Sequence, residues 1–224
     1  MIIAIDGPAG SGKSTVAKIV ARKLCFRYID TGSMYRSVAW KGLQKKAPLI
    51  DENIVANIAW ETKIELVSGE DGQLVFVDGQ DITNQLKKEA VSHGAAIVAA
   101  QPIIRKIMTA KQRELGKQGK VVMDGRDIGT VVFPKADKKF FLDADPEERG
   151  RRRFAELKGI KQEANADLTT IVKQIMQRDH EDRNRKIAPL KQAKDAILID
   201  TTYLSVDQVV EKIMKTINSD PINS

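Results

Sequence analysis

Short apolar runs that end in an aspartate recur along the chain and alternate with longer segments of helical periodicity. The runs lie at residues 2–5, 26–29, 121–123, 139–142 and 196–199, and they end at Asp6, Asp30, Asp124, Asp143 and Asp200. Short apolar runs between amphipathic helices are typical of strands buried on both faces of a parallel sheet. The pattern therefore predicts an α/β fold with a doubly wound, five-stranded parallel sheet.

The periodicity changes between about residues 60 and 85. Ile64 and Leu66, then Leu74 and Phe76, occupy alternate positions on either side of a glycine-containing turn at residues 69–72. A second turn signal follows within a few residues. Alternation around turns predicts an antiparallel hairpin, so we expect a small β insertion within the parallel α/β pattern.

Capping residues predict where several helices begin. Residues 84–100 form one continuous helical pattern, whereas residues 31–33, Thr-Gly-Ser, predict a break before a helix that starts near Met34. The expected starts are Asp51, Pro102, Asp145-Pro146, either Asp167 or Thr169, and the capping box from Ser205 to Gln208.

A glycine-rich loop directly follows the first predicted strand. It matches the pattern G-x-x-x-x-G-K-[ST] at Gly7, Gly12, Lys13 and Ser14. In such loops the backbone N–H groups surround phosphates, the lysine reaches the β- and γ-phosphates, and the hydroxyl can ligate Mg²⁺. We therefore expect ATP to contact the whole loop, which comprises Gly7, Pro8, Ala9, Gly10, Ser11, Gly12, Lys13, Ser14 and Thr15.

The third apolar run leads into a second loop of active-site character. It ends at Asp124, and a carboxylate at the end of a buried strand is the usual partner of Mg²⁺ in phosphoryl-transfer proteins. Arg126 and Asp127 follow, flanked by Gly125 and Gly129. This composition predicts an active-site loop, with Asp124 as a possible second oxygen ligand for the metal.

Two predicted helices carry arginines on one face. Arg149, Arg152 and Arg153 stand at i, i+3 and i+4, which suits a lid that closes over phosphates, although spacing alone equally allows a solvated basic face. A second face follows at Arg178, Asp182 and Arg185. The position of Arg36, near the end of the second strand, does not by itself distinguish a ligand-binding arginine from a solvated one.

Charge and composition narrow the classes of function. The net charge is +7, and residues 149–194 hold 13 Lys/Arg against 6 Asp/Glu, so the whole excess lies there. This favours a bound anionic ligand over a nucleic-acid surface, and aromatic residues make up only 5% of the chain. We expect no nucleic-acid partner.

Cysteine and histidine are too scarce for a metal cluster built on them. Two histidines make a His-based metal site improbable, and the single Cys25 is expected to be a small buried apolar residue. The chain shows neither a signal peptide nor an apolar run of about 18 residues. We therefore expect no membrane partner and a cytoplasmic protein.

With these motifs in place, the chain resembles the nucleoside monophosphate kinases, and among them the bacterial cytidylate kinases. The resemblance extends from residue 1 to about 217 and is carried by residues 5–15, 30–36, 124–134, 178–185 and 187–190. It implies a single kinase unit in three parts. These are a core at about 1–30, 103–148 and 186–217, a monophosphate-binding domain at about 31–102 that holds the β insertion, and a lid at about 149–168.

The resemblance also implies roles for individual residues. Arg36 and Arg126 would hold the acceptor phosphate, Arg178 and Asp182 would contact the ribose, and Arg105, Asp127 and Arg185 would lie near the cytosine. The implied monophosphate site comprises Thr31, Tyr35, Arg36, Arg105, Arg126, Asp127, Arg178, Asp182 and Arg185, and the implied catalytic residues are Lys13, Arg126, Arg152 and Arg153.

One position departs from the family pattern. The family would place a base-contacting serine six residues before Pro102, where this chain has Ala96. Ser92 lies one turn earlier on the same predicted helix and could supply that hydroxyl.

The implied reaction is transfer of the γ-phosphoryl group of ATP, with Mg²⁺, to CMP and dCMP by a monomer. Two alternatives remain open on sequence grounds. One is another small-molecule kinase on the same core, for UMP, a deoxynucleoside or shikimate. The other is a nucleotide-dependent nucleic-acid-binding protein.

Overall fold

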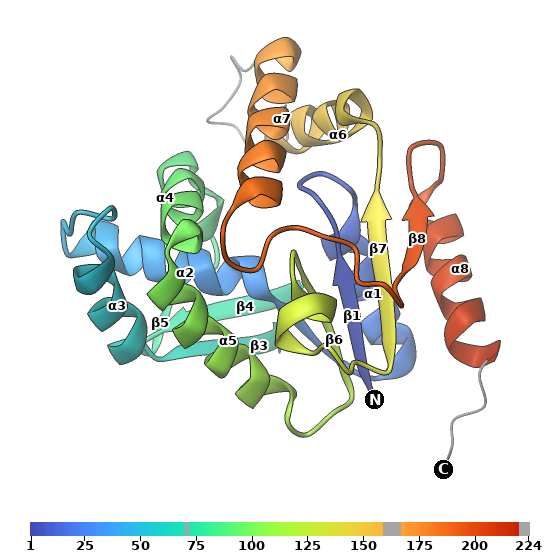
Figure 1. Cartoon of the computed structure of the whole chain (residues 1–224), viewed down its shortest axis with the longest axis horizontal. Helices are drawn as coiled ribbons and strands as arrows, with labels where there is room; N and C mark the ends of the chain where they lie inside the picture. The colour runs from blue at the N-terminus through green and yellow to red at the C-terminus, as the bar shows by residue number, and fades with distance from the viewer. Residues whose placement is uncertain (70–71, 159–166, 220–224) are drawn as a thin grey trace.

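The computed structural model describes residues 1–69, 72–158 and 167–219, and its centre is a five-stranded parallel sheet (Figure 1). The strand order is β2-β6-β1-β7-β8, so the first strand of the chain lies in the middle of the sheet. The predicted doubly wound α/β sheet is confirmed. Its strands are β1 (Ile2–Asp6), β2 (Arg27–Asp30), β6 (Val121–Gly125), β7 (Lys138–Asp143) and β8 (Ile197–Asp200).

Helices cover both faces of this sheet. Successive residues of a strand point to opposite faces, so Ile3 and Ile5 face one way and Ala4 the other. The first pair packs against α1 (Lys13–Leu24) and α8 (Val206–Ser219) in one apolar cluster. Ala4 joins a second cluster with the one-turn helix η2 (Ile128–Val132) and with Leu115 of α5 (Pro102–Gly116).

A second body of helices adjoins the core through α5. Its apolar centre includes Met34, Val38, Val55, Ile104 and Met108, all fully or almost fully buried. Besides α5, this body contains α2 (Thr31–Gln44), α3 (Glu52–Glu61) and α4 (Glu89–Ala100). The short turn η1 (Gln85–Lys87) precedes α4.

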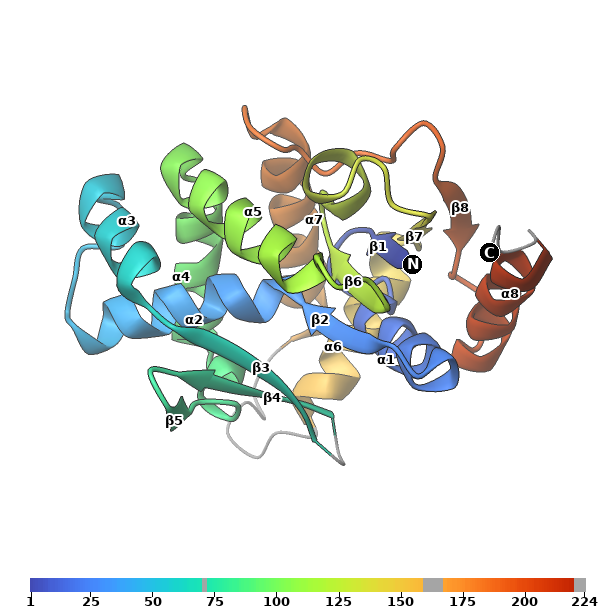
Figure 2. The ribbon, with the colours of Figure 1, turned by 90° about the horizontal axis from the view of Figure 1, so that it is seen from below.

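The predicted β insertion is confirmed as a three-stranded antiparallel sheet, made of β3 (Ile64–Gly69), β4 (Gly72–Val77) and β5 (Gln80–Asp81). Figure 2 shows this small sheet beneath α2, apart from the helices that cover the central sheet. Buried Val75 and Val77 of β4 pack against Trp40 of α2. The alternation seen in the sequence thus reflects one face that is packed against a helix.

Helices α6 (Pro146–Lys158) and α7 (Leu168–Asn184) form a pair above the carboxyl end of β7 (Figure 1). They pack through Phe154, Leu157, Ile171 and Ile175. The segment predicted as a lid, about 149–168, includes residues 159–166, which lie outside the described residues.

Most predicted helix starts agree with the structure. Asp51 caps α3, Asp167 caps α7, and Pro102 is the first residue of α5. The backbone N–H of Glu147 donates to the Asp145 carboxylate at the start of α6. Reciprocal bonds between Ser205 and Gln208 form the capping box before α8.

Three local predictions are wrong. Residues 31–33 are the first turn of α2, because the Asp30 carboxylate accepts from the Ser33 N–H and caps the helix at once. The extended backbone of Lys88 divides residues 84–100 into η1 and α4. Cys25 is exposed, since it ends α1 with a left-handed backbone (φ 55°).

No helix in the described ranges combines the length and apolar character needed to cross a bilayer.

Candidate active site

The phosphate-binding loop, residues 7–12, runs from β1 to α1 with left-handed backbone at its glycines. A Cβ at Gly7 would collide with the Leu142 carbonyl oxygen, and a Cβ at Gly10 would lie 2.9 Å from the Arg149 carbonyl oxygen. The loop is therefore clamped between β7 and α6. The phosphate-binding N–H groups lie where the α1 dipole adds positive potential.

Lys13 is buried at the first position of α1, and its Nζ donates to the Pro8 carbonyl oxygen at 2.9 Å. Burial, together with repulsion from Arg126, lowers the Lys13 pKa to about 7. Arg126 comes directly after Gly125, which pairs with Asp6 at the start of the phosphate loop, so the two loops follow neighbouring strands. Two neighbouring cations attract an anion.

Ser14 and Asp124, the two predicted Mg²⁺ ligands, are in contact. Ser14 Oγ donates to Asp124 Oδ2 at 2.6 Å, and the Tyr28 hydroxyl donates to Asp124 Oδ1 at 2.9 Å. Burial, with the charge of Asp30 acting in the same direction, raises the pKa of Asp124. One hydroxyl and one carboxylate suit Mg²⁺, which takes few protein ligands and completes its shell with phosphate and water.

Asp182 lies between two guanidinium groups. Arg126 Nε is 3.1 Å from Asp182 Oδ2, and Arg185 Nη1 is 3.0 Å from Asp182 Oδ1. Although burial acts in the opposite direction, these charges hold the pKa of Asp182 below its usual value. Burial and the neighbouring Arg126 lower the pKa of Arg178 to about 10, so a third guanidinium shares this site.

Asp127 forms a buried ion pair with Arg105 of α5 at 2.7 Å. Arg185 approaches the other carboxylate oxygen of Asp127 at 3.9 Å. The Arg105 guanidinium also lies 5.3 Å from the ring centroid of Tyr35, a buried side chain whose pKa burial raises to about 12. The residues that the resemblance assigned to the base are thus brought together.

Arg36 and Thr31, both in the first two turns of α2, have different partners. Arg36 pairs with Asp30 at 2.7 Å and is partly exposed. Thr31 Oγ1 donates to the Asp124 carbonyl oxygen at 2.7 Å, so its hydroxyl joins α2 to the end of β6. Thr31 therefore positions the helix that carries Arg36.

The three arginines predicted on one face of α6 have different surroundings. Arg149 is buried and bonds the carbonyl oxygens of Ala144 and Ala9 at 2.8 and 3.1 Å. Its Nη1 also lies 2.6 Å from Asp179 of α7. Arg149 thus joins α6 to the phosphate loop and to α7, and its burial excludes the solvated basic face for this residue.

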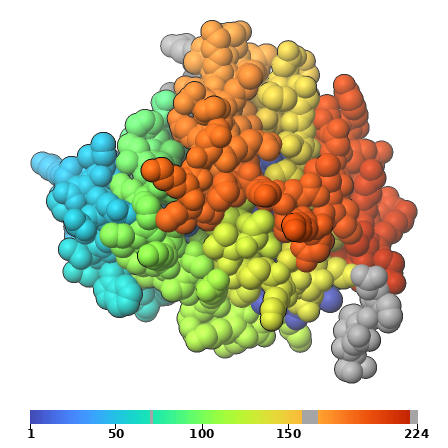
Figure 3. All heavy atoms as spheres, in the orientation of Figure 1, coloured from blue at the N-terminus to red at the C-terminus, as the bar shows by residue number. Residues whose placement is uncertain are grey.

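Arg152 and Arg153 are partly exposed on α6, and Arg152, like Arg149, is hydrogen-bonded within the protein, to Glu148 and Thr201. Arg152 Nη2 donates to the Thr201 carbonyl oxygen at 2.6 Å, and its guanidinium faces the Gly12 end of the phosphate loop. Arg153 pairs with Glu156 at 3.1 Å and is close enough to Arg178 to lower the pKa of that residue. In Figure 3 the atoms of α7 and of the segment after it spread across the middle of this face, beside α6.

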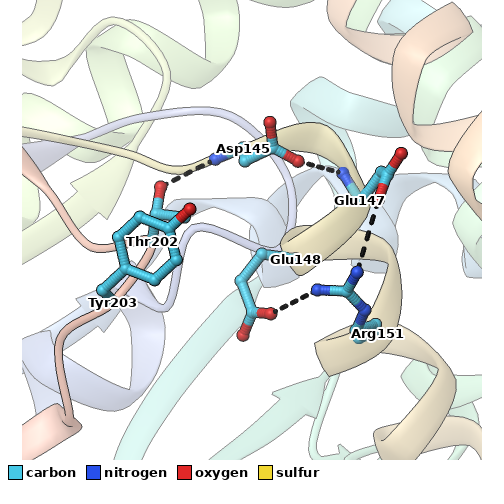
Figure 4. A pocket seen from close by; sticks show the side chains of 6 residues that line it. All are labelled: Asp145, Glu147, Glu148, Arg151, Thr202 and Tyr203. Atoms are coloured by element: carbon cyan, nitrogen blue, oxygen red, sulfur yellow. Dashed lines mark hydrogen bonds and ion pairs between the residues drawn. The ribbon is translucent and has the colours of Figure 1, made fainter.

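A shallow pocket lies beside the start of α6, where residues after β8 approach it (Figure 4). The Asp145 N–H donates to Thr202 Oγ1 at 3.0 Å, and Arg151 is paired with two glutamates. Carboxylates dominate the walls, which disfavours a phosphate there. The lining residues are Asp145, Glu147, Glu148, Arg151, Thr202 and Tyr203.

Two polar residues beside the site were missed by sequence reasoning. Asp6 was treated only as a strand end, yet its carboxylate accepts from the N–H groups of Ile128 and Gly129. Gln73 of β4 donates to the Tyr28 carbonyl oxygen at 2.6 Å and accepts from the Asp30 N–H at 3.2 Å. The aspartate that recurs after each strand was a signal that could have identified Asp6. No local pattern indicates Gln73.

Comparisons with known proteins agree with this geometry. The family model described as cytidylate kinase matches residues 3–219. A cytidylate kinase from Geobacillus sp. (strain WCH70) is 52% identical over 216 residues, covering 96% of both chains. The cytidylate kinase from Bacillus subtilis (strain 168) is 46% identical over 215 residues, covering 96% of this chain and 95% of that one.

A solved structure of shikimate kinase from Bacteroides thetaiotaomicron matches with a TM-score of 0.50 at 15% identity. The match covers 97% of this chain and 98% of that chain, and it shows a shared fold. The sequence relatives show more than a shared fold, because they are identical to this chain at about half of all positions over nearly its whole length. The chain belongs to the cytidylate kinase family.

Proposed function

We propose that the protein transfers the γ-phosphoryl group of ATP to CMP and dCMP. The observation that carries the proposal is the pairing of β6 with β1, because Arg126, which is ion-paired with Asp182, follows the strand next to the one that leads into the ATP-binding loop. Family membership supports the same reaction. We assign the activity to a monomer in the cytoplasm, and sedimentation of the purified protein tests the monomer.

ATP would occupy the phosphate-binding loop, with its terminal phosphates at Lys13. The transition state of phosphoryl transfer is loose, so positioning and charge neutralisation supply most of the rate enhancement. Lys13 and Arg126 would neutralise the transferred group from two sides, with Arg152 and Arg153 approaching from α6. The acceptor phosphate is already anionic, so no side chain has to act as a strong base.

A divalent metal would add to this neutralisation, and we propose Mg²⁺. Ser14 and Asp124 would hold it, and when bound it would neutralise negative charge on the phosphates of ATP. The residues fit the ion because both supply hard oxygen ligands next to the predicted phosphate position.

The acceptor nucleotide would lie along the arginine and aspartate cluster. Arg36 and Arg126 would hold its phosphate, and Arg178 with Asp182 would hold the ribose. Asp127, oriented by Arg105, would accept a hydrogen bond from the cytosine amino group, with Arg185 nearby. Uracil presents a carbonyl there, and facing it with a carboxylate would cost about 1–3 kcal/mol.

We further propose that the three parts implied by the resemblance move separately. The core would comprise about 1–30, 103–148 and 186–217, the monophosphate-binding domain about 31–102, and the lid about 149–168. Closure of the lid would exclude water and suppress hydrolysis of ATP. The lid carries most of α6, which packs against α7.

A coupled ADP-release assay with ATP, Mg²⁺ and a panel of acceptors tests the function. We expect CMP and dCMP to be preferred, UMP to be used roughly ten- to a hundredfold less efficiently, and AMP and GMP to be poor. Because Ala96 removes one expected base contact, the preference for cytosine should lie at the low end of that range. Equal efficiency with AMP and CMP, or turnover of shikimate alone, would overturn the proposal.

Asp182→Ala tests the acceptor site directly. Removing the carboxylate takes away the ion pairs that Arg126 and Arg185 make with it, so the KM for CMP should rise about tenfold or more while the KM for ATP stays within about twofold. Glu181→Ala is the matched control, since Glu181 is exposed and its side chain accepts from Gln177 on the same helix. An ATP defect as large as the CMP defect would exclude Asp182 from the acceptor site.

A further inference from the structure

The one-turn helix η2 begins in an unusual way. Asp127 occupies the position before its first residue, where an aspartate ordinarily accepts from the N–H groups of the first turn. Here the Asp127 side chain makes no such bond. It is turned instead towards Arg105, at 2.7 Å.

Asp6, from a different strand, takes over that capping role. Its Oδ1 accepts from the Ile128 N–H at 2.8 Å, and its Oδ2 accepts from the Gly129 N–H at 2.7 Å. Asp6 lies opposite Gly125 in the parallel pairing of β1 with β6, so the loop after β6 starts beside it. Both carboxylate oxygens are thereby used, and the side chain is 4% exposed.

We infer that Asp6 is a positioning residue for the acceptor nucleotide: by capping η2 from β1, it leaves the Asp127 carboxylate free for the base pocket. The inference rests on the proposed function, because it assigns Asp127 to the acceptor base. Asp6 touches no substrate in this account. It acts through the backbone of residues 128 and 129.

Electrostatics favour the same arrangement. When both are ionised, Asp6 and Asp127 carry like charges, and this repulsion contributes to the raised pKa of Asp6 after the larger effect of burial. Repulsion between the two carboxylates disfavours an Asp127 rotamer whose carboxylate points towards η2. The same repulsion favours the rotamer that points towards Arg105.

Loss of Asp6 would remove this preference of the Asp127 side chain for Arg105. The N–H groups of Ile128 and Gly129 would lose their acceptor, and the side chain of Asp127, directly before Ile128, could replace it. If Asp127 turns to cap η2, Arg105 loses its partner and the acceptor base loses its hydrogen-bond acceptor. The phosphate-binding loop starts at Gly7 but keeps its own glycine geometry and Lys13, so ATP binding should change much less.

Steady-state kinetics of Asp6→Asn and Asp6→Ala, with the unmodified protein beside them, test the inference. We expect the KM for CMP to rise about tenfold in each variant and the KM for ATP to stay within about twofold. The control is Asp51→Asn, because Asp51 caps α3 through two successive N–H groups far from the site. The control should leave both KM values unchanged.

A double variant separates positioning from general damage. In an Asp127→Asn background, Asp6→Asn should raise the KM for CMP less than about twofold, because the residue that Asp6 positions is already altered. An equally large effect in both backgrounds, or a parallel rise of the ATP and CMP constants, would overturn the inference. An unmodified protein that does not phosphorylate CMP would instead overturn the proposed function.

Amide hydrogen exchange in the unliganded protein supplies a readout independent of activity. Exchange at Ile128 and Gly129 should be faster in Asp6→Ala than in the unmodified protein, and unchanged rates would overturn the inference. If Asp6→Ala does not fold, Asp6→Asn gives the same readout, because its amide keeps only one acceptor oxygen for the two N–H groups of Ile128 and Gly129. Asp6→Asn should raise the KM for CMP more than the KM for ATP, and equal changes would count against the inference.

Discussion

Three ionisable side chains in or beside the candidate active site are buried. Lys13, Asp6 and Asp124 are each almost fully covered, and each has a pKa displaced in the direction of its neutral form. A charged group without water around it interacts strongly with any ion brought beside it. Substrates that carry phosphate and metal would therefore restore the charged states that burial disfavours.

Lys13→Ala should lower kcat by at least about a hundredfold, because the ammonium neutralises charge that grows in the transition state. Lys13 is buried, and its Nζ donates to the Pro8 carbonyl oxygen. Removing a buried cation should nevertheless leave the fold intact, which circular dichroism checks. Lys23→Ala, at the exposed end of α1, is the control. Retention of more than half the activity would contradict the assignment.

Asp6 should give the folded protein a pH dependence of unusual sign. Burial, opposed by the N–H groups of Gly129 and Ile128, raises its pKa from 3.8 to about 7. Between these values the folded protein holds a proton that the unfolded chain has released, so this contribution is complete below about pH 4 and lost as the pH rises through about 7.

Urea unfolding of the unmodified protein and of Asp6→Asn measures that contribution. The difference in the free energy of unfolding, unmodified minus variant, should shrink between about pH 5 and pH 8. A difference that grows or stays constant would show that the Asp6 pKa is not raised on folding.

At the scale of elements, the sequence predicted the boundary of a strand or helix correctly where one or two neighbouring residues determine it. The five strands and most helix starts follow from apolar runs and capping residues. The first turn of α2 was missed, because Thr-Gly-Ser also favours turns and only the Asp30 cap decides between the two. Lys88 was missed because its extended backbone interrupts a helical pattern that the apolar residues continue.

Contacts between elements were less accessible to sequence reasoning. The spacing of Arg149, Arg152 and Arg153 correctly indicated a basic helix, but not that Arg149 points inward. Its ion-pair partner Asp179 belongs to α7, and one of its two carbonyl acceptors, that of Ala9, belongs to the phosphate loop. Such partners depend on how the elements pack, which no local spacing encodes.

Arg149→Ala should lower the free energy of unfolding by about 3–5 kcal/mol, because it leaves Asp179 buried without its counter-ion. Hydrogen exchange in α6 and α7 should accelerate more than exchange in β1. Arg151→Ala is the matched control, since its ion pairs on the same helix are exposed and contribute less than about 1 kcal/mol. Similar losses in both variants would contradict the structural role of Arg149.

At the scale of the whole molecule, the small sheet is attached to the edge of the large one by a side chain. Gln73 of β4 bonds the backbone of β2 on both sides of Ile29. Strand β2 is an edge strand, so its outer N–H and C=O groups need partners. The β insertion supplies them and is thereby tied to Asp30, the partner of Arg36.

Gln73→Ala should lower the free energy of unfolding by about 1–2 kcal/mol, because the edge of β2 loses a donor and an acceptor. Hydrogen exchange at the Asp30 amide should accelerate. Gln80→Ala, on exposed β5, serves as the control and should change neither quantity. Unchanged exchange at Asp30 would show that the contact does not persist in solution.

The central position of β1 also bears on the order in which the chain can fold during synthesis. Ile2 pairs beside Val121 and Ile3 beside Lys138, so both neighbours of the first strand are made long after it. At typical translation rates the strand waits at least about 6 s before the nearer partner has been added. During that interval the nascent chain carries an unpaired apolar strand, and the nucleotide-binding loop has not formed. We expect the ribosome or a chaperone to shield this strand from solvent.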